Sequence, residues 1–136
     1  MAVTMDALCG VAMPLVQVYY DPRLLSFSDE DGIRTSTGRI KVIIAEELSC
    51  IKPDGTRLIL RPDKGFEVHV RPYGDHDASR YGVFIRIEAD YYPDREQNQR
   101  DRSDNIARRV RDTLYDGGYT VGVKLSLDSA AWSSAD

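Results

Sequence analysis

Four stretches of the chain have the short apolar or alternating pattern of β-strands. They are residues 15–20, 66–71, 82–89 and 119–127. In the last three, apolar residues alternate with polar ones, and successive side chains of a strand point to opposite faces. The pattern therefore predicts strands that each bury one face and leave the other polar.

A helix is predicted between the first two of these strands. Its apolar residues recur at the spacing of one helix face, namely Ile40, Ile43, Ile44, Leu48 and Ile51. Ser36 or Thr37 is expected to cap its start, after a polar loop over residues 23–35, and Pro53-Asp54-Gly55 to end it. The β-branched run Val42–Ile44 counts against a helix, because such side chains lose rotamer freedom there.

A second helix is predicted from Asp94 to Tyr115, in a long charged segment. Its narrow apolar stripe consists of Ile106, Ala107, Val110 and Leu114, which is typical of a surface helix with one buried edge. Gly117-Gly118 is expected to end this helix. A short extended run at 57–60 either joins the main sheet or forms a separate hairpin.

The order strand, helix, strand, repeated once, predicts an α+β fold. Two β-α-β units would form a four-stranded mixed sheet with both helices on one face, because each crossover should be right-handed. The other face would carry charged residues of central strands: Glu67, His69, Arg71, Arg86, Glu88 and Lys124. That face is either solvated or turned toward partner subunits around a wet cavity.

Length and charge narrow the classes of function. A chain of 136 residues fits one domain, with residues 1–12 as an N-terminal extension and 13–136 as the domain. The net charge of -4 gives no general electrostatic footprint for nucleic acid or an anionic membrane. No apolar run approaches the ~20 residues of a transmembrane helix. Cys9 and Cys50 lack metal-ligand spacing, so both are expected to be free thiols that bind no metal. A cytoplasmic protein without a cofactor is expected.

Met13-Pro14 stands directly before the first predicted strand and allows two interpretations. Proline at the first position of a strand is an ordinary structural choice, because the missing N–H costs nothing there. If translation or processing began at Met13, however, Pro14 would become a free secondary amine. Such an amine has an unperturbed pKa near ~8, and burial beside cations would lower it. It could then act as a base at neutral pH.

These features together resemble the tautomerase superfamily, and within it the 5-carboxymethyl-2-hydroxymuconate isomerase branch. The resemblance covers residues 13–133. It rests on MPLVQVYY at 13–20, on YGVFIR at 81–86 with the charged helix that follows, and on DSAAW at 128–132. It implies a homotrimer with sheets around a central channel and active sites between subunits. It also implies enol–keto isomerisation of a small unsaturated 2-oxo or 2-hydroxy acid.

The resemblance also assigns roles to individual residues. Pro14 would be the catalytic acid/base, and Arg71 and Arg95 would bind the substrate carboxylate, because a planar guanidinium matches a carboxylate in a bidentate pair. Tyr20 and Tyr73 would reach the pocket, although aromatic packing is the ordinary role of both. For His69 a packed strand histidine is favoured over a catalyst.

Two other functions stay open at this level. The twelve residues before Met13 leave the nitrogen of Pro14 an amide, which is not basic, so the chain could be a trimeric ligand-binding protein without activity. The β-α-β-β-α-β order also occurs in RNA-binding modules. The central strand at 82–88 has one outward aromatic residue and an acidic neighbour, and the chain is acidic, which argues against RNA.

Overall fold

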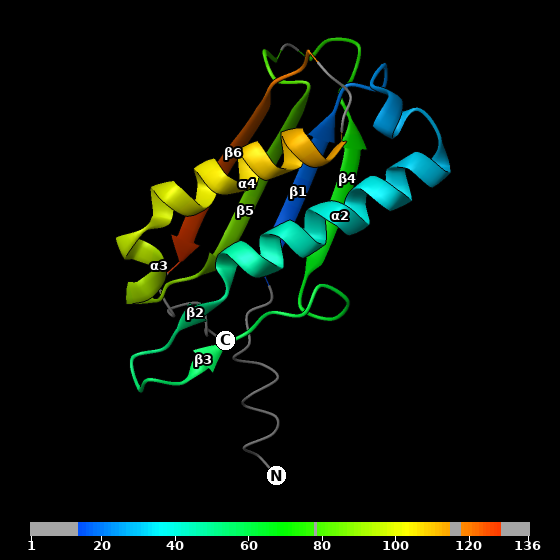
Figure 1. The fold of residues 1–136 in the computed structure, drawn as a ribbon. Coiled ribbons are helices and arrows are strands. Elements are labelled where there is room, and N and C mark those ends of the chain that lie inside the picture. Colours follow the sequence, from blue (N-terminus) through cyan, green and yellow to red (C-terminus); the bar gives the residue numbers. More distant parts are fainter. Residues whose placement is uncertain (1–13, 78, 115–117, 129–136) are drawn as a thin grey trace, which may run out of the picture.

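The computed structural model describes residues 14–77, 79–114 and 118–128, and its main feature is a four-stranded mixed sheet (Figure 1). The strand order is β4 (Glu67–Pro72), β1 (Leu15–Tyr20), β5 (Val83–Asp90) and β6 (Val121–Asp128). β1 is parallel to β4 and antiparallel to β5, and β5 is parallel to β6. The predicted α+β fold and mixed sheet are therefore confirmed.

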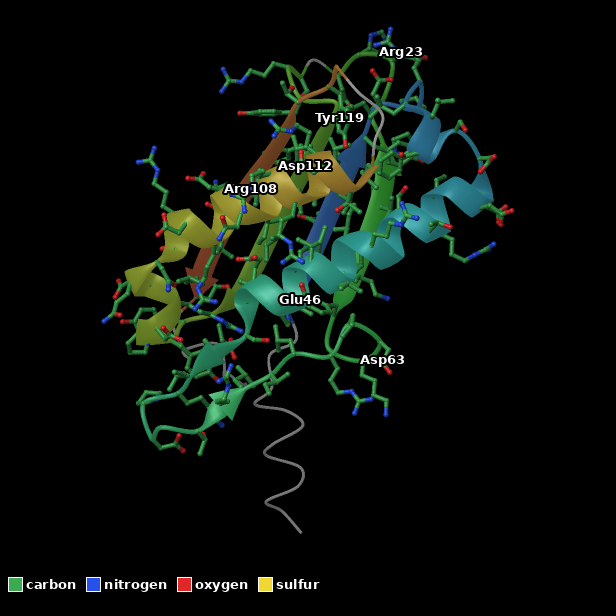
Figure 2. All side chains as sticks on the ribbon, viewed as in Figure 1. Arg23, Glu46, Asp63, Arg108, Asp112 and Tyr119 are labelled. Atoms are coloured by element: carbon green, nitrogen blue, oxygen red, sulfur yellow. The ribbon has the colours of Figure 1, made fainter. Side chains whose placement is uncertain are left out.

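Two long helices, α2 (Glu30–Leu48) and α4 (Gln99–Leu114), lie side by side across one face of the sheet (Figure 1). The core between the layers is apolar and includes Val16, Val18, Ile85, Ile87, Ile40, Ile44, Leu48, Ile106 and Val110. Charged side chains such as Glu46 and Arg108 project from the helices away from the sheet (Figure 2). Both helices cover the same face, as the sequence predicts.

The first helix begins at Glu30, six residues before the predicted cap at Ser36. Asp29 is the cap, because its backbone is extended and its Oδ1 accepts a hydrogen bond from the Gly32 N–H at 2.7 Å. Ser36 instead lies inside the helix and donates to the Ser26 carbonyl at 2.8 Å. Residues 30–35 belong to the helix where the sequence predicted a loop, and their polar members Glu30, Asp31, Arg34 and Thr35 are exposed.

Replacing Asp29 by alanine is expected to destabilise the protein by about 1 kcal/mol, because the Gly32 N–H loses its acceptor. Asp29→Asn should change little, since asparagine caps as well as aspartate does. Urea denaturation of both variants measures the difference. Equal stability of D29A and the original chain would show that the cap contributes nothing.

The end of α2 also differs from the prediction. The helix stops at Leu48, and Ile51, expected on its apolar face, is 51% exposed in the short strand β2 (Cys50–Ile51). β2 pairs with β3 (Arg57–Leu58) in a separate two-stranded sheet. The run at 57–60 therefore belongs to a hairpin outside the main sheet.

The predicted helix from Asp94 to Tyr115 is two helices. α3 (Pro93–Gln97) is followed by Asn98, whose φ of -129° and ψ of 32° lie outside the helical region. α4 starts at Gln99. Tyr115 to Gly117, where the helix was expected to end, lie outside the described residues. Arg109 joins α4 to α2 through ion pairs with Glu46 and, at 3.0 Å, with Glu47.

The open face of the sheet is polar in its middle, as predicted. Across the sheet, Gln17 pairs in register with His69 on one side and with Arg86 on the other, and Arg86 pairs with Lys124. Arg86 and Lys124 are both exposed. Two like charges side by side on neighbouring strands disfavour each other.

Candidate functional site

Pro14 lies at the start of β1, between the neighbouring strands β4 and β5. Its side chain is less than 2% exposed, and its carbonyl accepts a hydrogen bond from the Glu67 N–H at 3.0 Å. Its nitrogen forms the peptide bond with Met13. The expected extension, residues 1–12, and Met13 itself lie outside the described residues. We call the end of the sheet where β1 begins and β5 ends the proline end.

Arg95 lies at the proline end and is 1% exposed. Its Nε donates to the Leu48 carbonyl and its Nη1 to the Asp90 carbonyl, each at 2.9 Å. Its guanidinium also lies over the Tyr92 ring, 5.2 Å from the centroid. Burial lowers the pKa of Arg95 below its ordinary value, but an arginine starts so high that it stays charged.

Two further groups surround Arg95. Cys50 is buried, and burial raises the pKa of its thiol while the charges of Arg95 and Arg102 lower it. Arg102 donates through Nη1 to the carbonyls of Glu47 and, at 2.9 Å, Ser49. The two arginines thus occupy the carbonyls at the C-terminus of α2. A cation at this helix end is favourable because the helix dipole is negative there.

The other residues expected to bind substrate do not meet Pro14 within one chain. Arg71 is four residues beyond Glu67 on β4, so it lies roughly 13 Å further along the strand from the Pro14 carbonyl. Tyr73 follows β4 at the opposite end of the sheet. Tyr20 is only 6% exposed and stacks on Phe27 in the core, with ring centroids 4.5 Å apart.

His69 lies on the open face, where its Nε2 is 2.8 Å from a carboxylate oxygen of Glu67. Both side chains are accessible to solvent. An exposed histidine bonded to the carboxylate two residues before it on the same strand is an ordinary surface pair. The geometry therefore gives no support to a catalytic histidine.

The end of the sheet opposite Pro14 holds a cavity of about 400 Å³, which we call the aromatic pocket. Its walls are Tyr19, Tyr73, Tyr81, Phe84, Asp77 and Ser79. This pocket was not predicted from the sequence. The sequence does place aromatic residues at positions of β1 and β5 that face away from the helices, and Tyr19 and Phe84 are paired there.

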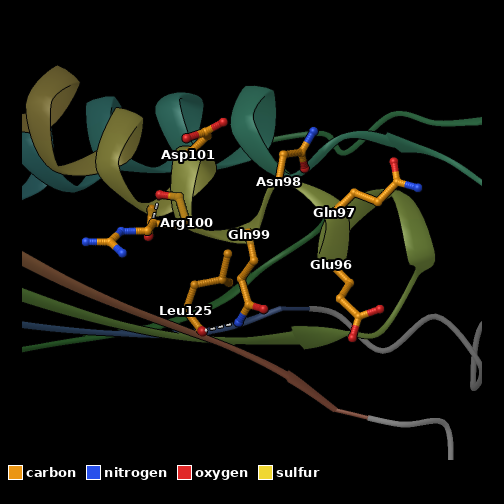
Figure 3. A pocket seen from close by; sticks show the side chains of 8 residues that line it. Glu96, Gln97, Asn98, Gln99, Arg100, Asp101 and Leu125 are labelled. Carbon is orange, nitrogen blue, oxygen red and sulfur yellow. Dashed lines mark hydrogen bonds between the residues drawn. The ribbon is translucent and has the colours of Figure 1, made fainter.

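A second cavity, of about 460 Å³, lies against α3, the start of α4 and β6 (Figure 3). Its lining is almost entirely polar, and Gln99 donates from its side chain to the Leu125 carbonyl at 2.8 Å. Neither this cavity nor the aromatic pocket is lined by Pro14. Within residues 14–77, 79–114 and 118–128, no group of three His, Cys, Asp or Glu could hold a metal ion.

None of the described helices is long and apolar enough to cross a bilayer. No protein-family model and no curated protein sequence matches the chain. Its likeness to known proteins is therefore a likeness of fold.

Solved structures share that fold. A 5-carboxymethyl-2-hydroxymuconate delta-isomerase matches with a TM-score of 0.59 at 15% identity, over 95% of this chain and 90% of the other. N1, a member of the cis-3-chloroacrylic acid dehalogenase family, matches with a TM-score of 0.53 at 13% identity, over 90% and 79%. A macrophage migration inhibitory factor-like protein from Entamoeba histolytica matches with a TM-score of 0.52 at 11% identity, over 86% and 90%.

The fold expected from the resemblance in the sequence is thereby confirmed, and one of these structures is a 5-carboxymethyl-2-hydroxymuconate delta-isomerase, the branch that the sequence resembles. The matches span 86–95% of this chain. Identities of 11–15% carry no residue roles by themselves. The function must therefore be argued from the site.

Proposed function

We propose that this protein is an isomerase that moves a proton in a small unsaturated 2-hydroxy or 2-oxo acid, with Pro14 as its acid/base. The observation that carries the proposal is the place of Pro14. It stands directly before β1, a central strand, in a fold shared with a 5-carboxymethyl-2-hydroxymuconate delta-isomerase. A strand flanked on both sides holds its first residue rigidly, as an acid/base requires.

The chemistry requires Pro14 to be the first residue. As a free secondary amine it has a lone pair, and in its neutral form it accepts a proton from the substrate. In an enol–keto conversion the enol oxygen loses a proton, and the double-bond carbon that does not bear this oxygen gains one, so no atom or electron is exchanged with another reagent. A positioned acid/base contributes ~10²–10⁴-fold to the rate of such a step.

Arg95 supports this chemistry in a different way from that expected from sequence. Its Nε and Nη1 donate to backbone carbonyls, so we assign it no direct hydrogen bond to the substrate. Its charge, at the same end of the sheet as Pro14, disfavours the charged form of a nearby amine and lowers its pKa. The same charge would stabilise negative charge that develops on the substrate oxygen.

We further propose that Arg71 binds the substrate carboxylate from a neighbouring copy in a homotrimer. The distance along β4 is too long for Arg71 to serve Pro14 of its own chain. The open face leaves room for contact between copies, because both long helices cover the other face of the sheet (Figure 1). Tyr20 and Tyr73 have no part in this proposal.

A gain of activity tests the proposal. The form that begins at Pro14, released from a fusion by a specific protease, is expected to convert phenylenolpyruvate to its keto form. The chain that begins at Met1 should be at least ~100-fold slower, since its Pro14 nitrogen is an amide. The two forms share every described residue. Equal, undetectable activity of both forms on a panel of 2-hydroxy-dienoic acids would overturn the assignment.

A second function is favoured by the burial of Pro14 in the chain as it stands. A proline that stays internal and less than 2% exposed cannot exchange protons, and the protein would then bind a ligand without converting it. The N-terminal residue of the untagged protein from its own cell separates the two functions. Pro14 at the terminus supports the isomerase, and an intact Met1 or Ala2 supports the binding protein.

A further inference from the structure

We propose that the aromatic pocket is a second binding site, specific for a small organic cation such as an alkylated ammonium group. It lies at the end of the sheet opposite Pro14, so it does not depend on the proposed isomerase chemistry. Three features point to a cation: the aromatic walls, the carboxylates beside them, and a ring that already carries a guanidinium.

The walls contain four aromatic rings from three neighbouring strands or their ends, in the order β4, β1 and β5 across the sheet. Tyr73 stacks near Tyr19, with centroids 6.4 Å apart, and Tyr81 stacks on Phe84, with centroids 5.8 Å apart. Tyr19 and Phe84 are direct partners on β1 and β5, which joins the two pairs. Several electron-rich ring faces around one cavity are what binds a quaternary ammonium.

The aromatic pocket and the cavity beside it carry more acidic than basic side chains. Asp77 is the charged residue of the aromatic pocket, and it also lines an adjoining cavity of about 300 Å³ with Asp75, Asp21 and Arg23. Arg23 is tied to Asp21 by a short ion pair, which lowers the pKa of Asp21 to about 2. The pair is neutral as a whole, so Asp75 and Asp77 leave these walls negative.

One ring already carries a cation. The guanidinium of Arg80 lies over the Tyr81 ring, 5.1 Å from the centroid, and its Nη2 donates to the Tyr81 hydroxyl at 2.9 Å. Arg71 lies opposite Tyr19 on β4 and Arg23 lines the adjoining cavity, but none of Arg23, Arg71 and Arg80 lines the aromatic pocket. The rings thus attract positive charge from this chain, and the pocket itself is lined by no positive group.

Residues 73–77 and 79–81 beside the pocket are held by local hydrogen bonds. The Gly74 N–H donates to Asp77 Oδ2 at 2.6 Å, and the Tyr73 hydroxyl donates to Ser79 Oγ at 3.1 Å. Ser79 Oγ also accepts the Tyr81 N–H at 3.1 Å. Tyr73, Asp77 and Tyr81 are therefore placed before any ligand binds, which reduces the cost of binding.

Gly122 fixes the position of the Tyr81 ring. A Cβ built on Gly122 would lie 2.8 Å from three atoms of that ring, closer than carbon atoms pack. The ring lies flat over β6 because residue 122 has no side chain. Gly122→Ala would push the Tyr81 ring aside without removing it. This variant therefore tests whether binding depends on where the ring lies.

Choline and its neutral analogue 3,3-dimethylbutan-1-ol, which replaces the ammonium nitrogen by carbon, form the decisive pair of probes. They are titrated into the full chain while the tyrosine resonances are followed by NMR. We expect saturable choline binding and at least fivefold weaker binding of the neutral analogue, because attraction to ring faces requires the charge. Equal binding of the two probes, or binding of neither, overturns the proposal.

Variants locate the site. Tyr73→Leu, Phe84→Leu, Asp77→Asn and Gly122→Ala should each weaken choline binding about fivefold or more. Tyr91→Leu and Asp63→Asn are the matched controls, because both residues are exposed and lie outside the pocket, and they should bind as the original chain does. The circular dichroism of each variant confirms its fold. Unchanged binding in the folded Tyr73 and Asp77 variants would place choline elsewhere and overturn the site.

Discussion

In the form that begins at Pro14, replacing this proline by alanine is expected to lower kcat/KM for enol–keto conversion by ~100-fold or more. Alanine still supplies an N-terminal amine, but a primary one whose nitrogen is no longer held by a pyrrolidine ring. The lone pair then has no single direction. Progress curves with phenylenolpyruvate, followed in the ultraviolet, measure the change.

The dependence of this activity on pH has a defined sign. The neutral amine is the base, so kcat/KM should rise with pH up to the pKa of the amine and level off above it. An unperturbed terminal amine has a pKa near ~8, and burial together with the charge of Arg95 should place the midpoint below that value. A midpoint above 8 would contradict the role given to Arg95.

The control for both measurements is Leu15→Val in the same form. Leu15 follows Pro14 on β1 and points to the open face, as Gln17 and Tyr19 do. This variant should keep most of the activity. If Pro14→Ala and Leu15→Val lose activity equally, the effect comes from the packing of the strand, and Pro14 is not the acid/base.

The sheet could be predicted from the sequence because its signal is local. Alternation in residues 66–71 and 82–89 reports which face of a strand is buried, and this holds whichever strand lies next to it. The start of α2 was missed for the opposite reason. Glu30, Asp31, Arg34 and Thr35 are polar because they lie on the exposed side of the helix, and the cap at Asp29 can be recognised only once the helix register is known.

The roles of Arg95 and of the aromatic pocket could not be predicted because they depend on contacts between distant segments. Arg95 meets the Leu48 carbonyl 47 residues away, and in the sequence it is one arginine among many. The pocket brings together Tyr19, Tyr73 and Phe84 from three separate segments. The position of Pro14 at the start of a strand could be predicted because its signal is local, and its role as the acid/base stays a prediction.

Replacing Arg95 by leucine is expected to destabilise the protein by about 3 kcal/mol, although the prediction from sequence placed this arginine in a binding site. The change removes two hydrogen bonds and leaves the buried carbonyls of Leu48 and Asp90 without these donors. A buried group that loses its partner costs ~1–3 kcal/mol. The loss of a buried charge that had to be desolvated offsets part of this cost.

Urea denaturation of Arg95→Leu, Arg95→Lys and Arg100→Leu measures this effect. Arg100 is an exposed arginine on α4, and its replacement should stay within ~0.5 kcal/mol. Lysine keeps the charge at the C-terminus of α2 but cannot reach both carbonyls as a planar fork does, so it should fall between the two. If Arg95→Leu is as stable as Arg100→Leu, the two carbonyls find other donors. Arg95 would then be free to serve the substrate, as the sequence first suggested.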